Sequence, residues 1–163
     1  MRSDIWLAEI QTLDHAQEMR ACRNQVRNFM THNTAEILPE EQVKWFEETY
    51  LPARKAKDLF GYVVRDGEEP LGYGLISKRD GRWWVSGGLV ADARGKGAGF
   101  YLFHEMTQMI HEDLRSEEAW LDVLNENEAA RGLYEKLGYV AVSSTDLLTV
   151  MVHRQFHEEA MAA

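Results

Sequence analysis

Glycines stand at alternate positions in residues 94–99, which read Arg-Gly-Lys-Gly-Ala-Gly. A strand is predicted before this segment and a helix directly after it. Free N–H groups and the positive dipole end at a helix N-terminus form an anion site, and glycines let the backbone approach a phosphate closely. Arg94 and Lys96 add positive charge. The segment therefore predicts a phosphate-binding turn, with an ordinary glycine turn as the alternative.

Two common phosphate-binding motifs do not fit this turn. The P-loop requires Gly-x-x-x-x-Gly-Lys-Ser/Thr, which differs from the spacing here. The dinucleotide fingerprint Gly-x-Gly-x-x-Gly also fails, because Phe100 stands where its last glycine should be. That fingerprint should open a βαβ unit as well, whereas this turn follows predicted antiparallel strands. Neither nucleotide-binding class is supported.

A second distinctive segment covers residues 127–139 and reads Asn-Glu-Ala-Ala-Arg-Gly-Leu-Tyr-Glu-Lys-Leu-Gly-Tyr. It resembles the Asn-x-x-Ala-x-x-Leu-Tyr-Glu-Lys-Leu-Gly-Phe/Tyr segment of the GNAT acyltransferases. Residues 94–99 match the Gln/Arg-x-x-Gly-x-Gly/Ala signature of the same family. The two motifs occur in the family's order, separated by a predicted helix and strand. The resemblance extends over roughly residues 59–153, while residues 1–58 fit the family's helical lead-in without a comparable motif.

The resemblance implies one GNAT-like domain over residues 1–163 with an α/β (α+β) fold. Its central sheet would be mixed but mostly antiparallel, flanked by helices, and splayed at the acetyl-CoA site. Residues 1–58 would form the acceptor side and residues 59–153 the core. Acetyl-CoA is the implied cosubstrate, with its pantetheine arm and pyrophosphate on the main chain of the strand and the turn. The implied cofactor-binding residues are Leu89, Val90, Arg94, Gly95, Lys96, Gly97, Ala98, Gly99 and Asn127.

Tyr134 is the catalytic residue that the resemblance implies. An uncharged amine attacks the thioester carbonyl, backbone amides stabilise the oxyanion, and the CoA thiolate leaves. A tyrosine hydroxyl near the sulfur can protonate that thiolate as a general acid. The alternative role for Tyr134 is a core aromatic on a helix stripe with Ala130, Leu133 and Leu137. The alternative role for Asn127 is helix capping.

The general base is not assigned by the sequence. An alkylamine with a pKa of about 10 must lose a proton before it attacks. Many relatives use a carboxylate on the strand before the glycine turn, but residues 83–89 contain no acid. Each substitute is alternatively a surface or capping group, and a chain of water molecules could serve instead. The substitutes are Asp92, Asp122, Glu41, Glu47 and His32.

The elements that must position these residues follow from apolar periodicity. The first third of the chain predicts helices over residues 14–30 and from Pro39 to Pro52, which should end the second helix. From Leu59 the period changes to two, and Asp-Gly pairs at 66–67 and 80–81 predict an antiparallel meander. Gly87 and Gly88 inside its last strand indicate a bulge or a close approach by another backbone or a ligand.

After the glycine turn, the sequence predicts a helix, a strand over residues 120–124, a second helix and two closing strands. The first of these helices has an apolar face that includes Leu102 and Met106. Asn125 is a suitable N-cap for the second helix, and Gly138 is placed just past its end. The closing strands are predicted over residues 139–142 and 147–152. One domain accommodates all of these elements.

Composition narrows the function class. The 163 residues are 45% hydrophobic and carry a formal net charge of -9. A nucleic-acid-binding protein would normally show a basic face, and no apolar run is long enough to cross a membrane. Cys22 is the single cysteine, which excludes an intrachain disulfide and a cysteine-rich metal site. We therefore expect a cytoplasmic protein with no metal, no nucleic acid and no membrane partner.

The acceptor class is the least determined part of the prediction. A small-molecule amine, such as an amino sugar or a polyamine-like compound, is expected, and the acidic balance favours a cationic one. A protein N-terminus, a lysine or a free amino acid stays open, as does a homodimer. A non-catalytic module that binds acyl-CoA as a sensor is the alternative from a different class, because a fold does not guarantee activity.

Overall fold

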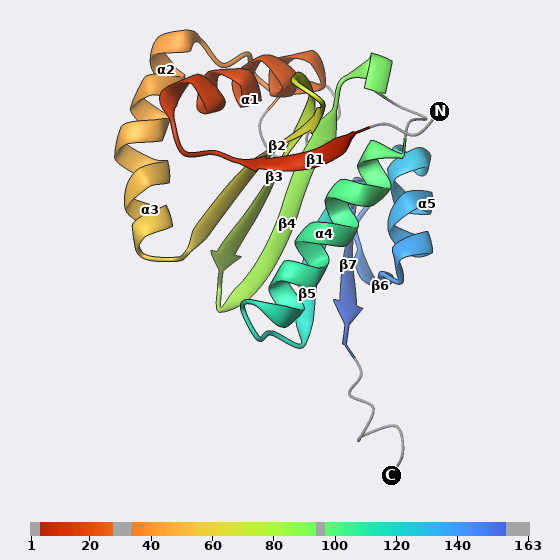
Figure 1. The fold of residues 1–163 in the computed structure, drawn as a ribbon. Helices are drawn as coiled ribbons and strands as arrows, with labels where there is room; N and C mark the ends of the chain where they lie inside the picture. Colours follow the sequence, from red (N-terminus) through yellow and green to blue (C-terminus); the bar gives the residue numbers. More distant parts are fainter. Residues whose placement is uncertain (1–3, 28–33, 94–96, 156–163) are drawn as a thin grey trace.

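The computed structural model describes residues 4–27, 34–93 and 97–155 (Figure 1). The strands are β1 Ile5–Glu9, β2 Leu59–Asp66, β3 Glu69–Arg79, β4 Arg82–Leu89, β5 Glu118–Leu124, β6 Val140–Ser144 and β7 Leu148–Arg154. The helices are α1 Leu13–Gln25, α2 Pro39–Lys44, α3 Leu51–Lys55, α4 Ala98–Glu112 and α5 Glu128–Leu137. A π-helical segment, η2 Trp45–Tyr50, joins α2 to α3, and a short 3-10 turn, η3 Ala91–Ala93, follows β4.

The described strands form one seven-stranded sheet in the order β1-β2-β3-β4-β5-β7-β6. All neighbours pair antiparallel except β4 and β5, which are parallel and are connected through α4. A parallel pair requires such a crossover, whereas the antiparallel neighbours β2, β3 and β4 need only short turns. The meander and the mixed, mostly antiparallel sheet are confirmed.

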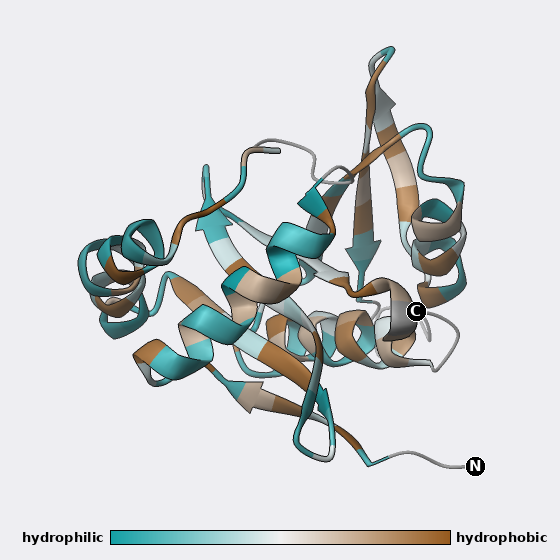
Figure 2. Cartoon of the chain, turned by 90° about the horizontal axis from the view of Figure 1, so that it is seen from above, coloured by the Kyte–Doolittle hydropathy of each residue, from teal (hydrophilic) through white to brown (hydrophobic). Residues whose placement is uncertain are grey.

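Two apolar clusters lie on opposite faces of the sheet, as the alternation of strand side chains requires. The neighbours Val63 and Val64 of β2 point into different clusters. One cluster contains residues of α1 and η2 (Ala16, Met19, Cys22, Phe46 and Tyr50). The other contains residues of α4 and α5 (Leu102, Phe103, Met106, Ile110 and Tyr134). Brown hydrophobic and teal hydrophilic residues accordingly alternate along the helices (Figure 2).

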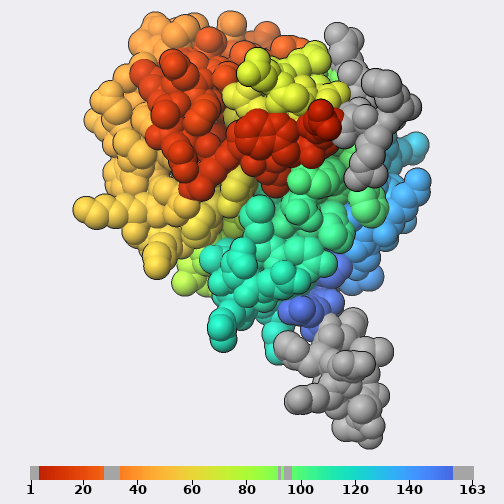
Figure 3. Space-filling view, viewed as in Figure 1, coloured from red at the N-terminus to blue at the C-terminus, as the bar shows by residue number. Residues whose placement is uncertain are grey.

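The N-terminal region differs from the prediction of an all-helical first third. Residues Ile5–Glu9 form β1, which pairs with β2 from Ile5 opposite Asp66 to Glu9 opposite Tyr62. In the space-filling view this red segment lies beside α4, on the same face of the molecule (Figure 3). The apolar pattern of these five residues is too short to predict a strand. The strand also depends on pairing with β2, whose residues lie far along the chain.

Pro52 does not end the second helix, in contrast to the sequence prediction. Helical structure continues from Pro39 through η2 to Lys55. Just before the proline, the N–H of Leu51 donates to the carbonyl of Phe46, five residues back. Pro52 then lies in the first turn of α3, where a helix tolerates a residue without an N–H donor.

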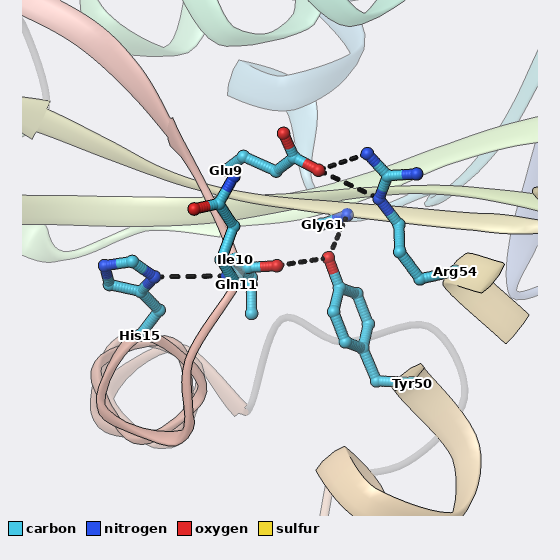
Figure 4. A network of polar contacts seen from close by, with 7 residues as sticks. All are labelled: Glu9, Ile10, Gln11, His15, Tyr50, Arg54 and Gly61. Carbon is cyan, nitrogen blue, oxygen red and sulfur yellow. Dashed lines mark hydrogen bonds and ion pairs between the residues drawn. The ribbon is translucent and has the colours of Figure 1, made fainter. Parts of the chain in front are cut away.

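Tyr50 ties this helix to the start of the sheet (Figure 4). Its buried hydroxyl donates to the carbonyl of Ile10 at 2.7 Å and accepts from the N–H of Gly61 at 3.3 Å. One turn further on, Arg54 forms an ion pair with Glu9 of β1. The helix 39–55 is therefore joined to both β1 and β2 by polar contacts as well as by packing.

Replacing Tyr50 by phenylalanine should lower the free energy of unfolding by about 1–3 kcal/mol. The change removes the shared partner of two buried backbone groups, those of Ile10 and Gly61. Urea unfolding followed by circular dichroism measures the loss. Tyr101→Phe is the control, because Tyr101 is only half-buried on α4 and loss of its hydroxyl should change stability little. Equal stability of both variants would contradict the assignment.

Candidate active site

The parallel strands β4 and β5 are joined at one end and separated at the other. Within the described residues, their register contains a single pair, Trp84 opposite Trp120. The two indole rings lie 5.9 Å apart, and the guanidinium of Arg82 lies 4.0 Å from the centre of the Trp120 ring. Past this contact the strands have no further paired residues, so the sheet opens toward Leu89 and Leu124. The predicted splay is present.

A cavity of about 450 Å³ occupies this opening. Its wall is formed by the ends of β4 and β5 together with parts of α4 and α5 and the residue that ends α1. The lining residues from the strands are Val85, Ser86, Gly87, Gly88, Leu89, Asp122, Val123 and Leu124. Those from the helices are Val26, Gly97, Gly99, Phe100, Phe103, Asn127, Ala129, Ala130, Leu133 and Tyr134.

Glycines are required where β3 and β4 approach each other closely, namely Gly72 on β3 and Gly87 on β4. A Cβ on Gly87 would lie 2.3 Å from the carbonyl oxygen of Tyr73, and a Cβ on Gly72 would lie 2.2 Å from that of Gly88. The register between β3 and β4 runs without a shift. For Gly87, the predicted close approach of another backbone is confirmed, and a bulge against β3 is wrong. Because Gly87 and Gly88 have no side chains, the backbone itself forms this part of the cavity wall.

The turn before α4 begins the helix with glycine in the left-handed region. Gly97 is the N-cap with a φ of 79°, and among the described residues no side chain caps the helix there. The N–H groups of the first helical turn therefore have no intrahelical acceptor. Gly97 and Gly99 line the cavity, whereas the Ala98 side chain is buried in the core. The remaining residues of the predicted phosphate turn, Arg94, Gly95 and Lys96, lie outside the described residues.

Leu89 and Val90 differ in their relation to the cavity. Leu89 lines it, at the end of β4. Val90 does not, and its N–H donates to the carbonyl of Leu71 at 2.8 Å while its carbonyl accepts from the N–H of Ala93 at 3.0 Å. The backbone groups of Val90 are thus hydrogen-bonded to β3 and η3, and Leu89 is the residue of this pair that lines the cavity.

Asn127, not Asn125, caps α5. The Asn127 side-chain oxygen accepts from the N–H of Ala130 at 3.2 Å, and the residue also lines the cavity. Asn125 instead donates to the carbonyl of Thr145 and accepts from the hydroxyl of Thr149. It therefore joins the turn between β6 and β7 to β5. At the other end of α5, Gly138 adopts a φ of 104° as predicted for the terminating glycine.

Tyr134 belongs to the core and to the cavity at once. Its ring packs edge-to-face on Phe103 with the ring centres 4.9 Å apart, and 8% of the residue is exposed. It also lines the cavity. Burial raises the pKa of its phenol well above the usual value of about 10, and the charges of Tyr139, Asp122 and Tyr73 raise that pKa further. The hydroxyl therefore stays protonated at neutral pH and can donate.

The structure separates the five residues that could replace the missing strand carboxylate. Asp122 lines the cavity. Glu41 accepts from the N–H of Leu38 and caps α2, and Glu47 is exposed on η2. His32 and the side chain of Asp92 lie outside the described part of the chain. Asp122 is thus the candidate base that the described structure brings together with Tyr134.

Cys22 lies in the apolar cluster beneath α1 and does not line the cavity. Burial raises the pKa of the Cys22 thiol to about 11, so the thiol is protonated at neutral pH. Within residues 4–27, 34–93 and 97–155, no three His, Cys, Asp or Glu side chains are grouped to hold a metal ion. No helix in these ranges combines the length and apolar character of a membrane span.

Comparisons with solved structures reveal the same fold in acetyltransferases. Spermidine N-acetyltransferase from Vibrio cholerae, in complex with CoA and spermine, is 17% identical, with 93% of this chain and 95% of that chain covered and a TM-score of 0.75. The apo form of FdhC, a nucleotide-linked sugar GNAT, is 13% identical, with 94% and 89% covered and a TM-score of 0.76. Ribosomal-protein-S5-alanine acetyltransferase from Vibrio fischeri is 14% identical, with 94% of each chain covered and a TM-score of 0.76.

The search of curated proteins gave no match. The family model of the acetyltransferase (GNAT) family matches residues 24–139, which is most of the chain and contains both segments that carry the sequence resemblance. Enzymes of this family are acyltransferases that use acetyl-CoA. The cavity between β4 and β5 accordingly lies where the sheet opens, between the start of α4 and Tyr134. The chain belongs to the acetyltransferase (GNAT) family.

Proposed function

We propose that this protein transfers an acetyl group from acetyl-CoA to a primary amine of a small molecule by direct attack. One observation carries the proposal: the opening between β4 and β5 places a helix N-terminus and a protonated tyrosine on the same cavity. A thioester needs both features, because one end of the cosubstrate is anionic and the other releases a thiolate. An acyl-CoA sensor would need only the first.

In this proposal the cosubstrate enters along the start of α4. The N–H groups that follow Gly97 receive the pyrophosphate, and Arg94, Gly95 and Lys96, which the sequence predicts to bind it as well, precede them in the chain. The pantetheine arm passes Leu89, in the gap that a continuous sheet would fill with ladder hydrogen bonds. Asn127 lies on the far side of this gap at the N-terminus of α5. The acetyl group then lies at the deep end, near Tyr134.

Tyr134 supplies the proton that completes the reaction. The amine nitrogen bonds to the thioester carbon, the carbonyl oxygen takes up negative charge, and collapse of this intermediate breaks the C–S bond. The departing sulfur takes the proton of the Tyr134 hydroxyl. The phenol is protonated at neutral pH, as a proton donor must be. Because its raised pKa lies above the thiol pKa of about 8.5, the proton transfer has to be coupled to C–S bond cleavage and to reprotonation of Tyr134.

The test is turnover of acetyl-CoA with a panel of amines. We expect amine-dependent release of free thiol, matched mole for mole by an acetylated product in mass spectrometry. The panel contains spermidine, a nucleotide-linked amino sugar and a peptide with a free N-terminus, which correspond to the acceptors named for the three structurally similar acetyltransferases. Acetyl-CoA without amine is the control. Thermal stabilisation by CoA without acetylation of any panel member would favour the sensor module instead.

A further inference from the structure

One strip of the sheet lies outside the apolar cluster that α1 covers. Among the described residues, that cluster reaches across β2 and β3 and includes none from β4 or β5. Ser86 is exposed as a result, although its strand lies between β3 and β5 in the sheet. Trp84 and Trp120 share this face with Ser86, because their neighbours Val85 and Leu121 belong to the cluster beneath α4. We call Trp84, Ser86 and Trp120 the β4–β5 strip, and it leads into the cavity, which Ser86 lines.

Two exposed arginines lie at the far end of this strip. The guanidinium of Arg82 lies 4.0 Å from the centre of the Trp120 ring, and that of Arg79 lies 4.5 Å from the centre of the Trp84 ring. The ring N–H of Trp84 also donates to the carbonyl of Arg79 at 3.4 Å. Because Trp120 is opposite Trp84, the charge of Arg82 lies at a level two residues, on the order of 7 Å, from Ser86 along β4.

The two positive charges are placed against each other. Arg79 and Arg82 are directly opposite in the register of β3 and β4, and like charges at opposite positions destabilise a strand pair. Neither forms an ion pair with a described residue, Asp80 of the same turn included. Glu118 of β5 is paired instead with Arg154 at 3.0 Å. An anion between the two guanidiniums would relieve their repulsion and accept hydrogen bonds from both.

We infer that Arg79 and Arg82 bind an anionic group of the acceptor, a phosphate or a carboxylate, while its amine enters the cavity past Ser86. This inference rests on the proposed function and names the acceptor class: a primary amine with an anion on the order of 7 Å away. The net charge of -9 attracts cations from a distance, but the charge at this end of the strip is positive. The tryptophan rings hold both guanidiniums in place, so little side-chain freedom is lost on binding.

The test uses two pairs of acceptors whose members differ mainly in the anion. One pair is an amino sugar that bears a phosphate on its anomeric oxygen and the same sugar as its methyl glycoside. The other pair is a dipeptide with a free C-terminal carboxylate and its C-terminal amide. In the wild type, kcat/KM should be about tenfold or more higher for the anionic member of at least one pair. The first pair reports a phosphate and the second a carboxylate.

Arg82→Gln removes one charge of this anion site and keeps a long polar side chain. Its kcat/KM should fall by about tenfold or more for the preferred anionic acceptor and by less than about twofold for the uncharged member of that pair. Arg79→Gln should act in the same direction. Arg82→Lys should recover part of the loss, because lysine keeps the charge without the bidentate fork. Lys136→Gln, at the exposed end of α5, is the matched control and should behave as wild type with all four acceptors.

The uncharged acceptors and CoA separate this inference from a structural role of the arginines and from the proposed function. CoA should raise the Tm of the wild type, Arg82→Gln and Lys136→Gln equally. Acetylation by the wild type without preference for either anion, or equal losses with charged and uncharged acceptors in Arg82→Gln, would overturn the inference while the proposed function stands. No acetylation of any amine by the wild type would overturn both.

Discussion

Tyr134→Phe should lower kcat by about 100-fold or more and leave the affinity for CoA unchanged. The substitution removes one oxygen and keeps the ring, whose edge-to-face contact with Phe103 depends on shape and apolar surface. Only the proton donor for the thiolate is lost. Single-turnover kinetics with acetyl-CoA, together with calorimetry for CoA, measures the two quantities separately.

The pH dependence of kcat is a second measurement that tests the role of Tyr134. Because the folded-state pKa of Tyr134 is raised, its hydroxyl should not deprotonate as the pH rises through the ordinary phenol value of about 10. Tyr139→Phe is a matched control, since that buried hydroxyl is hydrogen-bonded to Thr107 at 2.6 Å. The control should lose stability and keep its kcat. Wild-type turnover in Tyr134→Phe would assign Tyr134 to the core alone.

Gly97→Val should weaken CoA binding by about tenfold or more, which corresponds to about 1.4 kcal/mol. Gly97 has a φ of 79°, and a β-branched residue in this region carries strain of about 1–3 kcal/mol. Relief of that strain turns the peptide planes at the start of α4 away from the anion, and the valine methyl groups occupy the space where the pyrophosphate is proposed to bind. Isothermal titration with CoA measures the loss.

Gly81→Val separates backbone strain from ligand binding. Gly81 has a φ of 74° in the turn between β3 and β4, and open space surrounds the Cβ position of both glycines. The two variants should therefore lose similar stability, while Gly81→Val binds CoA as the wild type does. Normal affinity in a folded Gly97→Val protein would count against the anion site at α4.

Elements with a strong local pattern could be predicted from the sequence. The meander and α4 follow from apolar periods of two and of three to four, and Gly138 ends α5 because its own φ demands glycine. What could not be predicted depends on distant partners. β1 exists because it pairs with β2, and the helix passes Pro52 because η2 changes the hydrogen-bond spacing just before it.

The candidate site shows the same division. Gly97 and Tyr134 lie in distinctive sequence motifs, so they could be identified without a structure. Asp122 carries no such signal, because an acid within a short apolar strand has no distinctive spacing around it. Its place in the cavity comes from the register of Trp84 with Trp120, a pairing between strands that are separated by a whole helix.

The contact between Trp84 and Trp120 has a consequence for the stability of the molecule as a whole. With so little ladder between β4 and β5, the sheet consists of two sub-sheets, β1–β4 and β5–β7–β6, held together by side-chain packing and by whatever fills the gap. Acetyl-CoA bound as proposed would touch both sub-sheets, so its binding energy would also hold them together. A higher concentration of acetyl-CoA would then make the protein more resistant to local opening and to proteolysis.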